Sequence, residues 1–187
     1  KMVMEAAAKH LTPVVLELGG KSPCIIDKTA NLPIAAKRVA WGKSLNAGQT
    51  CIAPDYLMIH EDVKDQFLKL LVKEWKHLLT KNPQKAKHFV RIVSDKALDR
   101  LIGYLNDGTI YHGGHYDKSE RFLEPTILTN VSPDAPVMQE EIFGPIFPVL
   151  TFKHLDEVIS FINNREKPLA LYYFGKDDQQ ILHHTSS

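Results

Sequence analysis

The chain has 187 residues, of which 44% are hydrophobic and 24% charged, a composition typical of a globular protein long enough to bury a substantial core. Its formal net charge is +1, so no basic excess points to nucleic acid or to an anionic membrane as a partner. No apolar run approaches the roughly 18 to 20 residues of a membrane span, and no signal-peptide pattern opens the chain.

The chain carries two cysteines, Cys24 and Cys51. Two cysteines in a chain of this size do not make a disulfide framework, so a reducing compartment is expected. The pair lacks the spacing of metal ligands and no histidine cluster completes a site, so no metal is expected. We therefore predict an intracellular protein, cytoplasmic or on the cytosolic face of a membrane.

The first half of the chain alternates helical and extended patterns. Hydrophobic spacing and alanine content indicate the helices, and short apolar runs indicate the strands. In chain order the sequence predicts a helix at 2–10, strands at 14–18 and 24–27, a helix at 32–45, a strand at 56–60 and an amphipathic helix at 63–78.

The second half continues the alternation. Ser94 is positioned to cap a helix whose apolar face carries Leu98, Leu101, Ile102 and Leu105. After a turn-rich zone around Gly108, Gly113 and Gly114, the pattern predicts extended segments at 122–128 and 145–152, a helix at 156–163, a strand at 169–175 and a last helix from about Asp177. Strands that are apolar throughout and alternate with helices predict an α/β fold with a mostly parallel sheet covered by helices.

The stretch "NAGQTCIAPD", from Asn46 to Asp55, raises the first chemical question. A cysteine in such a glycine-containing turn can attack a carbonyl carbon if its thiol is accessible and its pKa is lowered. Gly48 permits a close backbone approach, and the N–H groups near Cys51 could stabilise an oxyanion. Free cysteine is also among the most buried residue types, so local sequence leaves nucleophile and core residue both open.

Glu17 lies in "VVLELGGK", within the predicted strand that Gly19 and Gly20 end. A carboxylate in apolar surroundings should have a raised pKa, which suits a general base near neutral pH. Alternation along the strand could equally point Glu17 to solvent. The third stretch, "MQEEIFGPIFP", sets two carboxylates before Phe143 and a Gly-Pro turn, and alone it is a weak signal.

Together the motifs "LELGGKSP", "GQTC" and "EEIFGP" resemble those of an NAD(P)-dependent aldehyde dehydrogenase. The flanking stretches "AAAKHLTP", "CIAPDY" and "REKPLALYYF" resemble the class 3 branch, which acts on fatty and aromatic aldehydes. The resemblance runs over essentially the whole chain and is weakest between residues 72 and 116. Three motifs in the right order, with 34 positions from Glu17 to Cys51, make it highly specific.

The resemblance implies roles for the two catalytic candidates. Cys51 matches the nucleophile that attacks the aldehyde to form a thiohemiacetal, which becomes a thioester after hydride transfer. Its backbone N–H matches half of the oxyanion hole. Glu17 matches the base that activates water to hydrolyse the thioester, a step that needs proton removal.

The resemblance also implies cofactor contacts. Glu141 matches the carboxylate that binds the nicotinamide ribose hydroxyls, and Phe143 matches the aromatic residue that packs near the nicotinamide. The backbone of Leu18 and Gly19 matches the segment that lies beside the nicotinamide. The cofactor itself, NAD or NADP, is expected to be held largely by a domain that this chain lacks.

The family's domain order divides the chain into residues 1–13, the end of a cofactor-domain region, and 14–187, a catalytic domain that is incomplete at its C-terminus. The expected substrate is a medium- or long-chain or aromatic aldehyde. The full-length parent is expected to be a homodimer that touches a membrane only through segments absent here. Two alternatives stay open: a non-catalytic truncated homologue or assembly module, and a relative that passes its acyl group to coenzyme A, against which Glu17 argues.

Overall fold

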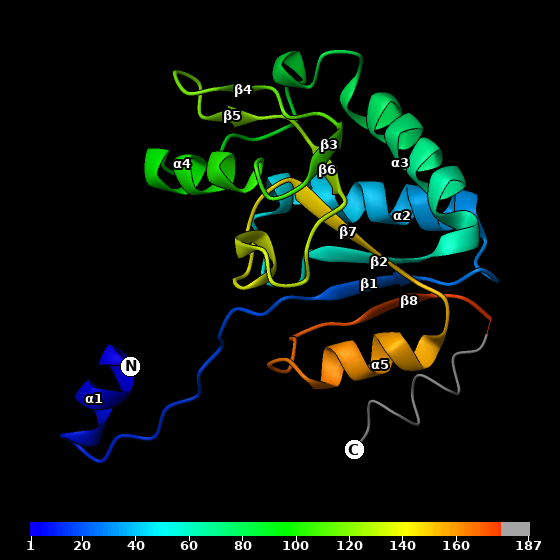
Figure 1. The fold of residues 1–187 in the computed structure, drawn as a ribbon. Helices are drawn as coiled ribbons and strands as arrows, with labels where there is room; N and C mark the ends of the chain where they lie inside the picture. The colour runs from blue at the N-terminus through cyan, green and yellow to red at the C-terminus, as the bar shows by residue number, and fades with distance from the viewer. Residues whose placement is uncertain (177–187) are drawn as a thin grey trace.

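A six-stranded sheet lies at the centre of the protein in a computed structural model that describes residues 1–176 (Figure 1). The first half forms α1 (Met2–Ala8), β1 (Pro23–Ile26), α2 (Leu32–Ser44), β2 (Tyr56–His60), α3 (Lys64–Leu79) and α4 (Asp95–Tyr104). The second half forms β3 (Thr109–His112), β4 (Tyr116–Asp117), β5 (Phe122–Leu123), β6 (Thr126–Thr129), β7 (Ile146–Phe152), α5 (Leu155–Asn163) and β8 (Tyr172–Phe174).

The strand order is β3-β6-β7-β2-β1-β8, and every pair is parallel except β3 with β6. The prediction of an α/β fold with a mostly parallel sheet is therefore confirmed. The crossover through α2 moves from β1 toward β7, whereas the crossover through α5 moves from β7 back to β8. Because such crossovers are right-handed, α2 and α5 lie on opposite faces of the sheet (Figure 1).

Burial on both faces explains why the central strands are apolar throughout. Every residue of β1 and of β2 is buried. The helix α3 contributes a stripe at helical spacing that includes Phe67, Leu71 and Trp75. These side chains join one continuous core that also holds α2 and β7.

Most predicted elements are present with ends shifted by one or two residues. The helix after Ser94 begins as expected, and the Ser94 hydroxyl accepts a hydrogen bond from the Ala97 N–H at 3.2 Å. The predicted strand at 169–175 is shorter, because only Tyr172–Phe174 pairs with β1. The turn-rich zone contains β3 and β4, which the sequence did not predict, and the helix expected from Asp177 lies outside the described residues.

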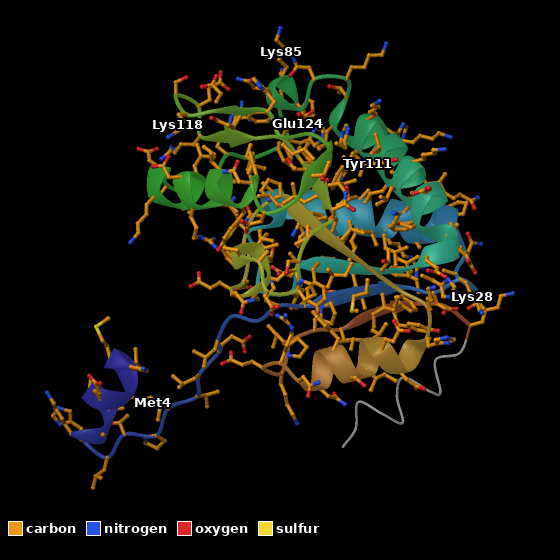
Figure 2. All side chains as sticks on the ribbon, in the orientation of Figure 1. Met4, Lys28, Lys85, Tyr111, Lys118 and Glu124 are labelled. Atoms are coloured by element: carbon orange, nitrogen blue, oxygen red, sulfur yellow. The ribbon has the colours of Figure 1, made fainter. Side chains whose placement is uncertain are left out.

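The predicted strand at 14–18 is wrong. Residues 12–22 have no regular structure, and Val15 is 99% exposed. Residues 12–18 lead from α1, which carries Met4, toward the sheet, and α1 and these residues lie apart from the core (Figures 1 and 2). A strand needs a hydrogen-bonded neighbour, and among the described residues none lies beside this stretch.

Along residues 1–176, no helix combines the length and the apolar character that crossing a membrane requires.

Candidate functional site

Three parallel strands begin at one edge of the sheet, and the segment before each of them carries candidate residues. Residues 19–22 precede β1, residues 51–55 precede β2, and residues 141–145 precede β7. Since β1 pairs with β2 and β2 with β7, these three segments meet. The topology thus brings together motifs that are far apart in the sequence.

The Cys51 turn, residues 50–55, follows a tightly wound segment at the end of α2. Asn46, Ala47 and Gly48 have consecutive φ angles of 50°, 53° and 71°, all in the left-handed region. A Cβ at position 48 would clash with the carbonyl oxygen of Gly144, so glycine permits this close crossing of two backbones. The sequence prediction that Gly48 allows a close backbone approach is confirmed.

The Cys51 thiol is free and half-buried. Among the described residues, its backbone N–H donates to no acceptor, and the Thr50 hydroxyl is buried without a partner. Cys24 differs because it is fully buried in β1, and burial raises the pKa of its thiol. The turn therefore offers a partly exposed cysteine with an unused backbone donor, whereas Cys24 is a core residue.

Two side chains hold the Cys51 turn from outside it. The Tyr172 hydroxyl of β8 donates a hydrogen bond to the Ile52 carbonyl. The ammonium of Lys43, buried in α2, donates to the Pro54 carbonyl at 2.9 Å and lies 4.5 Å from the centroid of the Phe147 ring. Burial lowers the pKa of Lys43 to about 8.

Lys21 and Asp55 form a buried ion pair where the three segments meet. The second carboxylate oxygen of Asp55 accepts a hydrogen bond from the Ile142 N–H at 2.9 Å. The Lys21 ammonium also donates to the carbonyls of Val137 and Glu140, at 2.9 and 2.8 Å. Burial lowers the pKa of Lys21, and the charge of Asp55 opposes that effect.

Glu141 lies against the backbone of Gly19, where a Cβ would clash with the Glu141 carboxylate. Burial raises the pKa of Glu141, as does the charge of Asp55, while the Gly20 N–H and Lys21 act in the opposite direction. The carboxylate lines a cavity of about 450 Å³ together with Gly19, Gly20, Lys21 and Arg165.

Two arginine contacts and one exposed ring complete the Glu141 segment. Arg100 of α4 donates to the carbonyls of Glu141 and Ile142, at 3.1 and 2.7 Å. Phe143 has a φ of 49° and its side chain is 38% exposed. An aromatic ring in an uncommon backbone conformation that faces solvent suits a contact surface better than a core position.

The structure brings together some of the predicted site residues and leaves others apart. Gly19 and Glu141 are in contact, and the Cys51 turn is joined to them through Asp55. Glu17 and Leu18 are exposed on the irregular stretch before β1. No hydrogen bond or ion pair joins Glu17 to Cys51 within residues 1–176, and the apolar strand expected around Glu17 is absent there.

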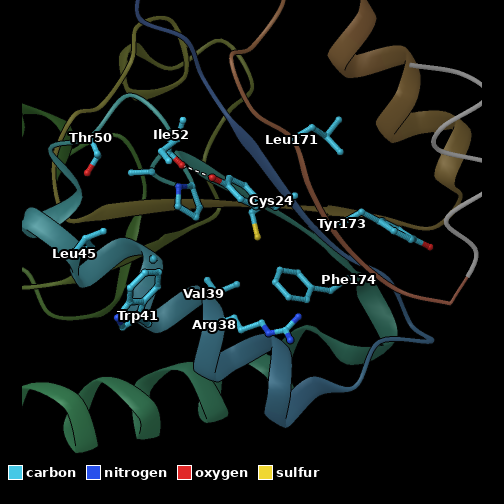
Figure 3. A pocket seen from close by; sticks show the side chains of 14 residues that line it. Cys24, Arg38, Val39, Trp41, Leu45, Thr50, Ile52, Leu171, Tyr173 and Phe174 are labelled. Carbon is cyan, nitrogen blue, oxygen red and sulfur yellow. Dashed lines mark hydrogen bonds between the residues drawn. The ribbon is translucent and has the colours of Figure 1, made fainter. Parts of the chain in front are cut away.

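An apolar cavity of about 640 Å³ lies beside the Cys51 turn, between α2 and β8 (Figure 3). Thr50 and Ile52 line one side, and Val39 and Phe174 line another. Within the described part of the chain, no group of three His, Cys, Asp or Glu side chains is arranged to hold a metal ion.

Sequence reasoning missed Lys43, Asp55, Arg100 and Tyr172. Lys43 could have been found, because it continues the buried stripe of α2 at Ala36, Val39 and Ala40. A lysine on an apolar helix face signals a buried cation that needs acceptors. Asp55 and Arg100 carry no such signal, since their partners lie 87 and 41 residues away.

Comparison with known proteins gives a consistent result. The model of the aldehyde dehydrogenase family matches residues 1–187. The dimeric, NADP-preferring aldehyde dehydrogenase of Rattus norvegicus is 48% identical over 181 residues, which cover 97% of this chain and 40% of the relative. Aldehyde dehydrogenase family 3 member A2 of Mus musculus is 50% identical over 181 residues, 97% of this chain and 37% of the relative.

Among solved structures, the substrate-bound state of a Staphylococcus aureus enzyme titled AldH superposes on the whole chain with a TM-score of 0.95 and 46% identity. The chain covers 41% of that structure. It thus spans about two fifths of the length of these relatives.

Proposed function

This chain belongs to the aldehyde dehydrogenase family and resembles its class 3 members, and we propose that it is the catalytic segment of an NAD(P)-dependent enzyme that oxidises aldehydes to carboxylic acids. Residues 14–187 would form the catalytic domain and residues 1–13 the end of the cofactor-domain region. The observation that carries the proposal is the half-buried Cys51 thiol beside its own unused backbone N–H.

Cys51 acts first. Its thiolate attacks the carbonyl carbon of the aldehyde, and the carbonyl oxygen becomes an oxyanion in a thiohemiacetal. The Cys51 N–H is free to donate to that oxygen, so it supplies one donor of an oxyanion hole. Because the hydroxyl of Tyr172 and the ammonium of Lys43 hold the carbonyls that follow Cys51, the turn keeps its shape during attack.

NAD(P)⁺, when bound, would serve as the acceptor of the hydride that the thiohemiacetal loses. The residues present fit this cofactor, since the Glu141 carboxylate lines a cavity with other charged side chains and a carboxylate suits the two hydroxyls of a ribose. Gly19 leaves the backbone bare beside that carboxylate, and Phe143 presents an exposed ring nearby in the sequence. Leu18 and Gly19 would line the nicotinamide side of the site.

Glu17 acts last, as the base that removes a proton from the water attacking the thioester carbon. Cys51 then leaves as a thiolate and the acid is released. The place of Glu17 in "LELGGKSP" supports this role. Glu17 is exposed on an irregular stretch, which leaves its carboxylate free to accept a proton. The same glutamate disfavours transfer of the acyl group to coenzyme A, which would need no hydrolytic base.

The alternative is a non-catalytic truncated homologue or assembly module. An exposed apolar stretch usually packs against another part of a protein, and here it includes Leu11, Val15 and Leu18. This exposure favours the alternative for the 187-residue chain on its own. We expect aldehyde substrates of medium or long chain, or aromatic ones, and a dimeric parent, by analogy with the relative named dimeric.

Hydrolysis of an activated ester such as p-nitrophenyl acetate by the 187-residue chain tests the nucleophile, because acylation of a thiol needs no cofactor. We expect slow turnover, since lacking one oxyanion donor costs about 10²–10³ in rate. Cys51→Ala should abolish it, whereas Cys24→Ala, the matched control, should retain it. The same preparation should form no NADH from hexanal.

Unchanged ester hydrolysis in Cys51→Ala would refute the assignment of the nucleophile. Formation of NADH by the chain alone would refute the view that a further domain holds the cofactor.

A further inference from the structure

The buried ion pair of Lys21 and Asp55 joins all three segments that carry the proposed site. Lys21 follows Gly19 and Gly20, and Asp55 lies four positions after Cys51. Their side chains are only 13% and 4% exposed. An ion pair this deeply buried gains little from its own attraction after desolvation, so its place in the fold calls for another explanation.

The pair binds the backbone on both sides of Glu141. The Lys21 ammonium donates to the carbonyl of Glu140, and the Asp55 carboxylate accepts from the N–H of Ile142. These bonds involve a charged group, and such bonds are shorter and stronger than neutral ones. One ion pair therefore fixes the backbone groups on both sides of Glu141.

A third contact limits the remaining freedom of the segment. Arg100 donates to the carbonyls of Glu141 and Ile142, so the carbonyls of residues 140, 141 and 142 all accept from charged side chains. The Glu141 carboxylate is left against Gly19 in the 450 Å³ cavity. A fixed backbone restricts the Glu141 side chain to the staggered rotamers that this backbone conformation allows.

We propose that Lys21 and Asp55 are positioning residues that hold the Glu141 carboxylate in place for the cofactor ribose. The inference rests on the proposed function, in which Glu141 binds that ribose. The pair acts through backbone groups and does not itself touch substrate. It also couples the Cys51 turn to the Glu141 segment, because Asp55 belongs to one and binds the other.

A purely structural ion pair predicts a different pattern of defects from a positioning pair. Removing one charge leaves the other buried and unpaired, which destabilises the fold, while removing both relieves that penalty. Stability should therefore fall in Lys21→Met and Asp55→Asn and recover in the double variant. Positioning of Glu141 should stay impaired in all three.

The test measures steady-state kinetics in the full-length enzyme that contains residues 1–187, with hexanal and either NAD⁺ or NADP⁺. In both single variants and in the double variant, KM for the cofactor should rise about tenfold, the loss expected for one charged hydrogen bond. KM for hexanal and the alkylation rate of Cys51 without cofactor should change by less than about threefold. KM for the cofactor should lie closer to the wild-type value in Lys21→Arg than in Lys21→Met.

The matched control is the ion pair of Lys118 and Asp99, which has the same charges at 2.6 Å but side chains 64% and 60% exposed (Figure 2). Lys118→Met/Asp99→Asn should leave all constants unchanged. Recovery of the cofactor KM together with stability in the Lys21→Met/Asp55→Asn double variant would overturn the inference. Equal impairment of KM for the cofactor, KM for hexanal and the alkylation rate of Cys51 would also overturn it.

Hydrogen exchange at Ile142 in the 187-residue chain separates this inference from the proposed function. If the wild-type enzyme oxidises no aldehyde, the proposed function fails. The Ile142 amide should still be protected, and it should exchange at least about tenfold faster in Asp55→Ala if Asp55 holds it. Unchanged exchange in Asp55→Ala would refute the positioning role on its own.

Discussion

The Cys51 turn and the stretch that carries Glu17 each hold one half of the proposed chemistry, yet they are built in opposite ways. The turn is fixed by a glycine crossing, by Lys43 and by Tyr172. The Glu17 stretch has no strand, and its apolar side chains are exposed. The proposed nucleophile is thus positioned by contacts within this chain, whereas the proposed base is not.

The largest expected effect comes from disturbing the backbone crossing at Gly48, which holds the Cys51 turn but not the Glu17 stretch. Gly48→Ala combines a positive φ with a clash against the Gly144 carbonyl, so it should lower the free energy of unfolding by about 3 kcal/mol. Gly103→Ala, in α4 with open space around it, is the control and should be neutral or stabilising by up to about 1 kcal/mol. Urea denaturation measures both, and equal stabilities would mean that the crossing is not a constraint.

Limited trypsin digestion compares the two regions directly through two lysines. Lys9 is exposed at the end of α1, whereas Lys21 is held by Asp55 and two carbonyls. Cleavage after Lys9 should be at least about tenfold faster than cleavage after Lys21, because cleavage needs local opening of the backbone. Mass spectrometry of the fragments gives the two rates. Equal rates would show that the Glu17 stretch is held as firmly as the segment that follows it.

The smallest expected effect concerns pH and Lys43. Its pKa is about 8 in the folded chain and 10.5 when unperturbed, so the unfolded chain binds more protons between these values. Stability should therefore rise with pH, by about 1 kcal/mol from pH 8 to 9. As the pH approaches and passes 9.0, the raised pKa of Cys24 acts in the opposite direction, because the folded chain keeps a proton that the unfolded chain loses.

Urea midpoints at pH 8.0, 8.5 and 9.0 measure this slope, and Lys43→Met should flatten it. Lys21, whose pKa is also lowered, contributes a slope of the same sign that remains in this variant. A slope that is unchanged in Lys43→Met would show that Lys43 is not the group responsible.

The sequence predicted what depends on local pattern. The spacing of Phe67, Leu71 and Trp75 was sufficient for α3, and Ser94 for the start of α4. The stretch at 14–18 was misread as a strand because apolar content alone does not provide a neighbouring strand. Apolar runs predict burial only where the fold brings a partner alongside.

In the candidate site, too, local pattern predicted some features and contacts between distant residues determined the others. Motifs pointed to Cys51, Glu17 and Glu141, since each lies in a short stretch that resembles a motif of the family. The contacts that fix those stretches were not visible, because Lys21 reaches Glu140 across 119 residues and Asp55 reaches Ile142 across 87. Such pairs follow from strand order in the sheet, which local patterns do not specify.

The hydrogen bond from Tyr172 to Ile52 has a consequence for synthesis on the ribosome. Its two partners are 120 residues apart, and Tyr172 belongs to β8, the last of the described strands to be made. A chain that grows from its N-terminus therefore exposes the Cys51 thiol well before the tyrosine that holds its turn has been translated. We therefore expect the turn to acquire its final shape only when the nascent chain extends beyond β8.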